Sequence, residues 1–213
     1  MLTGPSQIAL AAALAASCMN SASASSPFEG RLANGAPSST CTVLGVTKCT
    51  MFYDSTLNIT ILNDWNIGKG PWYANSGAGS VQALAASAGL AASGLTGWVL
   101  PSGDGSQVAG TQNQYQSIWK DAGASFVGLS GQFAGVLFDD YWSGTDYSFN
   151  YAYGFNAGGG YAEYLTKTPI DQYYAVAVRP GDVAAAVPEP QSYAMLLAGL
   201  GALMVVVRRR RRR

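Results

Sequence analysis

The residues that usually carry out enzymatic chemistry are sparse in this chain of 213 amino acids. Histidine, the side chain that most often moves protons near neutral pH, is absent, so no serine or cysteine has an imidazole to activate it. Asp139 and Asp140 are adjacent, so in an extended segment they project to opposite sides and form no facing acid pair. We therefore expect no catalytic residue. The alternative is a secreted hydrolase with an unrecognised carboxylate site.

Oxygen ligands for a cation are the next chemistry to consider. Asp139, Asp140 and Asp146, together with carbonyl groups of the loop between them, could coordinate calcium, which prefers clustered oxygens. Their spacing matches no calcium-binding loop, and solvated carboxylates in turns explain them better. We expect neither a metal nor a cofactor.

Aromatic residues are concentrated in the last third of the chain, where sugar rings could stack on them. Tyrosine and tryptophan suit this because they combine an apolar face with a polar edge. The residues concerned are Tyr141, Trp142, Tyr147, Tyr151 and Tyr153. We take Trp142, Tyr147 and Asp146 as candidate ligand-binding residues. The competing interpretation is that the rings simply fill the core, because residues 149–155 alternate with period two.

The C-terminal segment combines three features in a fixed order. Val187, Pro188, Glu189 and Pro190 precede an apolar run, which ends at six arginines. As a helix, residues 192–207 span about 24 Å at 1.5 Å per residue, slightly less than the hydrocarbon core of a bilayer. We expect a transmembrane helix there, with Arg208, Arg209 and Arg210 as a cytoplasmic stop and the preceding chain outside. The alternatives are a buried core helix and a plain proline-rich linker.

This C-terminal pattern, residues 187–213, closely resembles the PEP-CTERM sorting signal. The resemblance implies an exosortase, a membrane enzyme, as processing partner, with Glu189 and its flanking prolines as a substrate site. It also implies an inner-membrane-anchored precursor that later reaches the cell surface or the extracellular matrix, where exopolysaccharide is assembled. We therefore expect an exported, non-catalytic protein that associates with extracellular polysaccharide. The alternative is a purely structural matrix component.

Residues 1–24 are typical of an export signal. An apolar run from Ile8 to Ala16 is followed by small residues, which favour cleavage after Ala24. The first seven residues lack the usual basic charge, which leaves open whether Met1 is the true start. Cys18 departs with the signal, so Cys41 and Cys49 remain and are predicted to form a disulfide in an exported chain.

The charge of the exported part excludes one class of partner. Residues 25–187 carry six basic and eleven acidic side chains, a net charge of −5 that the arginine tail hides in the whole-chain value of zero. Nucleic-acid binding needs clustered Lys and Arg to displace counterions. We therefore expect no nucleic-acid partner.

Local patterns predict a mixture of strands and two helices. Strands are expected at 51–53, 57–62, 98–100, 149–155 and 173–179. One helix is expected after a Ser80 cap, and a second after a capping box that begins at Thr111 and closes at Gly123. We divide the chain into a signal peptide (1–24), a flexible lead-in with the disulfide loop (25–49), one domain (50–182) and the sorting segment (183–213).

Four short motifs give the domain a second resemblance. They are Tyr53–Thr60, Gly97–Ser102, Tyr141–Thr145 and Val178–Gly181. Their order and spacing resemble the Lcl C-terminal-type domain, with departures at Ile61 and Val99, where the family commonly has tryptophan and arginine. The resemblance implies an α+β fold, a C-type-lectin-like mixed domain with short antiparallel strands and two helices, and glycan binding in some members.

Overall fold

The computed structural model describes residues 27–43, 46–47, 49–72 and 79–184. In these residues the largest elements are two five-stranded sheets. The first sheet is antiparallel throughout. Its strands, in spatial order, are β12 (Val178–Pro180), β6 (Ile59–Leu62), β5 (Met51–Asp54), β1 (Phe28–Arg31) and β2 (Pro37–Ser38). A small hairpin, β3 (Thr42–Val43) with β4 (Val46–Thr47), lies between β2 and β5 in the chain.

The second sheet carries the aromatic residues of the last third of the chain. Its spatial order is β10 (Tyr161–Thr166), β9 (Tyr151–Asn156), β8 (Asp140–Asp146), β11 (Tyr173–Tyr174) and β7 (Lys69–Gly70). All pairs are antiparallel except β11 with β8. The pairing of β8 with β9 shifts register between Trp142 and Asp146, where β8 has an irregularity.

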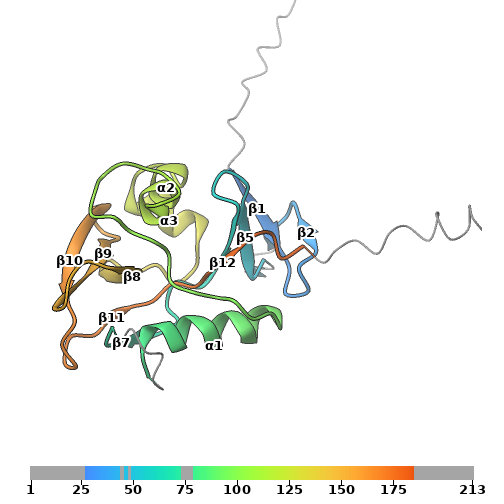
Figure 1. Cartoon of the computed structure of the whole chain (residues 1–213). Coiled ribbons are helices and arrows are strands. Elements are labelled where there is room, and N and C mark those ends of the chain that lie inside the picture. The colour runs from blue at the N-terminus through green and yellow to red at the C-terminus, as the bar shows by residue number, and fades with distance from the viewer. Residues whose placement is uncertain (1–26, 44–45, 48, 73–78, 185–213) are drawn as a thin grey trace, which may run out of the picture.

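Three helices accompany the sheets: α1 (Val81–Ser93), α2 (Gln114–Asp121) and α3 (Phe126–Gln132). Figure 1 shows α1 along one side of the molecule, with α2 and α3 grouped together away from it. The Ser80 side chain caps α1 by accepting from the Ala83 N–H, as the sequence predicts. Asn113, and not Thr111, caps α2, because its side chain accepts from the Gln116 N–H.

Two buried clusters hold the sheets and helices together. One surrounds Trp65, whose ring lies against Tyr115, Phe133 and Tyr141. The other contains Trp72, Trp98 and Trp142 and receives the apolar side of α1. Trp98 and Trp142 are both almost fully buried, so both belong to the core.

The predicted fold class is wrong. The domain is mostly β-sheet with three helices, one more than predicted. The extra helix, α3, contains Gly128 and Gly131, which weaken any local helix signal. Among the described residues, no helix is both long and apolar enough to cross a bilayer. The segment predicted to do so, residues 192–207, lies outside the described residues.

The predicted lead-in also needs correction. The sequence predicts a flexible lead-in with the disulfide loop at residues 25–49, but β1 is an interior strand of the first sheet, between β5 and β2. Phe28 is buried, and its ring lies 5.2 Å from that of Phe133. This apolar burial draws the segment into the domain. The disulfide between Cys41 and Cys49, the predicted pair, fastens the following loop to the start of β5.

Candidate functional site

The three residues predicted to bind a ligand do not come together. Trp142 is fully buried and donates its indole N–H to the Gly70 carbonyl at 2.9 Å, and its ring centre lies 6.5 Å from that of Trp72. Asp146 pairs with Lys167 at 2.7 Å, and that ammonium group also lies 4.6 Å from the centre of the Trp72 ring. Tyr147 is 52 % exposed and contacts a different set of residues.

The structure instead gathers Tyr147, Tyr153 and Tyr164 into one exposed cluster, which we call the tyrosine cluster. The ring centres of Tyr147 and Tyr164 are 4.5 Å apart, and Tyr153 lies 5.3 Å and 5.6 Å from them. Tyr153 and Tyr164 are direct cross-strand partners in β9 and β10, so their rings share one face of the sheet. The cluster therefore rests on rigid strands.

Strand alternation explains why Trp142 and the tyrosine cluster are separated. Side chains two residues apart share a face, so Tyr153 lies on the same side of β9 as the buried Phe155. Ala152 in β9 and Leu165 in β10 lie on the other side, with Trp142 in the second core cluster. The two faces of the second sheet thus have different roles, and the ligand-binding candidates fall on both.

A loop forms one wall of the tyrosine cluster. A Cβ atom at Gly105 would lie 2.6 Å from the Tyr153 ring and 3.1 Å from the Tyr164 hydroxyl, so the bare backbone approaches both rings. Gly105 also has a φ of 74°, which disfavours other residues. Asp104 fixes the loop by accepting at Oδ1 from Ser106 and from the Asn113 side chain.

Burial and hydrogen bonds shift the pKa values of Asp104, beside the tyrosine cluster, and of Tyr153 within it. Burial acts against the ionised form of Asp104, but the hydrogen bonds from Ser106 and Asn113 outweigh it and lower the pKa of the carboxyl group. Burial, with the neighbouring Tyr164 and Tyr147, raises the pKa of Tyr153, so its hydroxyl stays protonated. The cluster thus offers aromatic faces and the protonated Tyr153 hydroxyl beside one carboxylate.

A pair of acidic residues lies elsewhere on the second sheet. Burial first, and then the charge of Asp140, raises the pKa of Glu163. Asp140 also accepts from the Asn156 side chain at 2.7 Å. A carboxyl group with a raised pKa suits a general acid, but neither residue lines the groove described next. Asp139 does not belong to this acidic pair, because its carboxylate forms an ion pair with Lys69.

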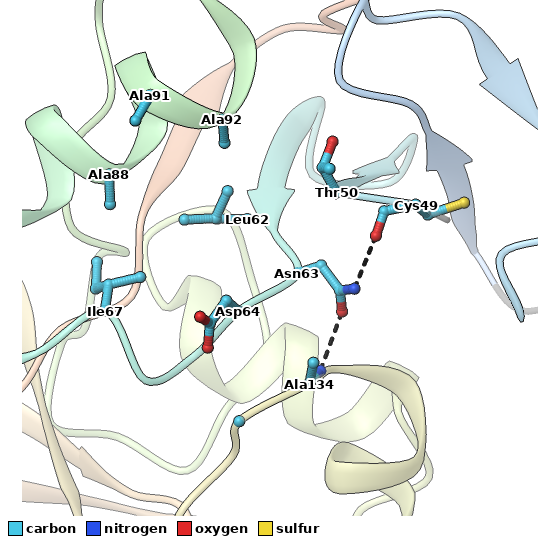
Figure 2. Close-up of a pocket in the computed structure, with 11 residues that line it drawn as sticks. Cys49, Thr50, Leu62, Asn63, Asp64, Ile67, Ala88, Ala91, Ala92 and Ala134 are labelled. Atoms are coloured by element: carbon cyan, nitrogen blue, oxygen red, sulfur yellow. Dashed lines mark hydrogen bonds between the residues drawn. The ribbon is translucent and has the colours of Figure 1, made fainter. Parts of the chain in front are cut away.

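A groove of about 710 Å³ lies between α1 and the segment that follows β6. Figure 2 shows alanines of α1 on one side, with Leu62 and Ile67 facing them and Asn63 on the opposite side. Asn63 is fully engaged there, donating to the Cys49 carbonyl and accepting from the Ala134 N–H. The lining is mostly alkyl, with the Asp64 carboxylate, which accepts from the Asn66 N–H, and the Thr50 hydroxyl as its other polar groups.

Comparison with known proteins adds a finding about the C-terminal segment. Residues 186–212 match the family model described as the PEP-CTERM protein-sorting motif. This match supports the predicted exosortase substrate, and it implies export through a membrane-anchored precursor that is processed. No curated protein and no solved structure matches the chain. The resemblance of residues 50–182 to the Lcl C-terminal-type domain is not shown.

Several predicted residues lie outside the described part of the chain. They include the export signal (1–24) and the sorting and stop residues Val187, Pro188, Glu189, Pro190, Arg208, Arg209 and Arg210. Tyr164 is the site residue that the sequence did not reveal. In residues 161–166 apolar and polar side chains do not alternate cleanly, so nothing local marks Tyr164 as a partner of Tyr153.

Proposed function

We propose that this exosortase-processed protein of the cell surface or extracellular matrix is non-catalytic and binds extracellular polysaccharide through its tyrosine cluster. The observation that carries the proposal is the gathering of three tyrosines, two from the neighbouring strands β9 and β10 and one from the connection between β8 and β9. Tyr147 and Tyr164 are 52 % and 54 % exposed, so their rings are accessible to a ligand. Sugar rings present C–H groups to such faces and hydroxyls to their edges.

The charge of the domain narrows the kind of polysaccharide. The exported part carries an excess of acidic residues, and Asp104 lies beside the tyrosine cluster with a lowered pKa. An anionic polymer would be repelled by this surface. A neutral polysaccharide meets no such repulsion, and its hydroxyls can donate to the Asp104 carboxylate, whose Oδ2 is not used in the hydrogen bonds that fix the loop.

Binding of purified protein to neutral polysaccharide from the envelope of the producing cell tests the proposal. We expect Tyr164→Ala to weaken binding about fivefold, since a stacked ring contributes on the order of 1 kcal/mol. Tyr161→Ala is a matched control, because Tyr161 belongs to the same strand and is 44 % exposed but has the opposite parity. Equal losses in the two variants, or no binding by the wild type, would reject the tyrosine cluster as the site and favour a purely structural role.

A further inference from the structure

A partly buried ion pair fastens the end of the described domain to its first strand. Arg31 in β1 is 3 % exposed and donates two parallel hydrogen bonds to Asp182, from Nε to Oδ1 at 2.8 Å and from Nη2 to Oδ2 at 2.6 Å. This bidentate geometry is the strongest arrangement available to an arginine and a carboxylate. Hydrogen bonding from Arg31 lowers the pKa of Asp182, so the carboxyl group stays ionised.

Hydrogen bonds and packing also fix the residues next to Asp182 in the chain, Gly181, Val183 and Ala184. The Thr60 hydroxyl in β6 donates to the Gly181 carbonyl at 2.8 Å and accepts from the Val183 N–H at 3.2 Å. Val183 is 4 % exposed and belongs to the second core cluster. The Ala184 N–H donates to Asp182 at 2.8 Å. We call the Arg31–Asp182 pair and the Thr60 hydrogen bonds the C-terminal clamp.

The C-terminal clamp lies very close in sequence to the sorting motif. Glu189 is five residues after Ala184. Five residues span at most about 18 Å even when fully extended. If residues 181–184 were released, the last fixed residue would be Pro180, and the maximum reach to Glu189 would become about 32 Å. The clamp therefore nearly halves the distance that the motif can extend from the folded domain.

A short reach matters to an enzyme that must bind the motif. Enzymes and domains that grip a peptide commonly take it in extended form, with several residues in contact on each side. With the C-terminal clamp closed, four residues separate Ala184 from Glu189, so any enzyme bound at Glu189 meets the folded domain around the clamp.

We propose that the surface of the first sheet around the C-terminal clamp is the part of this domain that abuts the exosortase, and that the closed clamp limits the rate of cleavage. The proposal rests on exosortase processing of the chain, because without it the surface has no enzyme to meet. Opening the clamp lengthens the reach of the motif and relieves contact between the enzyme and the fold.

The test follows processing of the full-length chain in cells that contain an exosortase, with cells lacking it as the background. Pulse-chase labelling with mass analysis gives the rate at which the C-terminal segment is lost. Asp182→Asn opens the ion pair, and Thr60→Val removes the hydroxyl that holds Gly181 and Val183. Four residues inserted after Ala184 lengthen the reach with the clamp intact. We expect all three changes to accelerate cleavage several-fold.

Two further variants give the matched comparisons. Deletion of Ala185 and Ala186 shortens the reach and is expected to slow cleavage. Asp146→Asn breaks the Asp146–Lys167 pair, an ion pair on the second sheet, and is expected to leave the rate unchanged. Faster cleavage of the insertion variant combined with slower cleavage of the deletion variant would support the proposed limit on reach even if Asp182→Asn failed to fold.

The possible outcomes distinguish a failure of this inference from a failure of the proposal that an exosortase processes the chain. A wild-type chain that stays intact in exosortase-containing cells would contradict exosortase processing of this protein. A wild-type chain that is cleaved at the same rate as the insertion and deletion variants would overturn the limit on reach and leave exosortase processing standing. Acceleration by the insertion without acceleration by Asp182→Asn or Thr60→Val would show that the clamp is not what restrains the motif.

Discussion

The packing of α1 on Trp98 gives a stability prediction whose sign is not obvious from sequence. Gly89 lies in the middle of α1, where glycine is about 1 kcal/mol worse than alanine. By propensity alone, Gly89→Ala is stabilising. However, a Cβ atom at Gly89 would lie 2.6 Å from Trp98 Cδ1 and closer still to two other ring atoms. Trp98 is 3 % exposed and donates to the Ser93 hydroxyl, so the ring has no room to retreat.

We therefore expect the steric clash with Trp98 to outweigh the gain in helix propensity, so that Gly89→Ala is destabilising. Overpacking a core costs typically 1–3 kcal/mol, and a rigid indole places this site near about 3 kcal/mol. After the gain in propensity, Gly89→Ala is expected to lose about 2 kcal/mol of unfolding free energy. For a protein of this size that corresponds to a fall in Tm of roughly 4–8 °C. Urea denaturation and thermal unfolding of the purified protein give both quantities.

Gly131→Ala in α3 is the matched control. It is the same substitution in a helix, but a Cβ atom there meets nothing within 4 Å. We expect a gain of about 0.5 kcal/mol, since alanine restricts the unfolded chain without strain in the folded one. A Gly89→Ala variant as stable as the wild type, or more stable, would refute the packing of α1 against Trp98 described above.

Two other predictions concern the covalent and ionic links of the first sheet. Arg31 lowers the pKa of Asp182, so the stabilisation from this pair is complete above the unfolded pKa of about 3.9 and is lost as the pH falls through the lower folded value. Asp182→Asn should therefore cost about 2 kcal/mol at pH 7 in urea titrations. The cost should be smaller at pH 3, because the Asp182 carboxyl group is then largely protonated in the unfolded chain and the pair contributes less; an equal loss at both pH values contradicts this. Replacing Cys41 and Cys49 together by serine should cost about 2.5 kcal/mol from the loop they close, and unchanged unfolding in urea would contradict that stabilisation.

Local signals in the sequence predicted the elements that depend on local chemistry. Ser80 caps α1 because a hydroxyl accepts from a free N–H three residues later, and this arrangement needs no distant partner. In contrast, α3 was missed because Gly128 looks like a helix breaker. In the fold a Cβ atom at Gly128 would collide with the Ala122 carbonyl, so the glycine is required by packing that no local pattern reports.

The candidate site was predicted only in part for a similar reason. Tyr147 and Tyr153 were among the aromatic residues proposed for sugar stacking, and both belong to the tyrosine cluster. Ser143 and Gly144 interrupt the apolar alternation, so the sequence gives no reason to continue a strand through them, although β8 does continue. Arg31 and Asp182 are 151 residues apart, and their pairing depends on the chain after β12 lying against Thr60 of β6, a tertiary contact that no local pattern reports.

The position of the last strands has a consequence for how the protein matures after synthesis. β11 lies between β8 and β7, and β12 pairs with β6, so both sheets stay incomplete until residues 173–184 have joined them. A chain threaded outward from its N-terminus delivers these residues last. Completion of both sheets therefore has to wait until little more than the sorting segment is left to emerge, and we expect folding and recognition by the sorting enzyme to coincide in time.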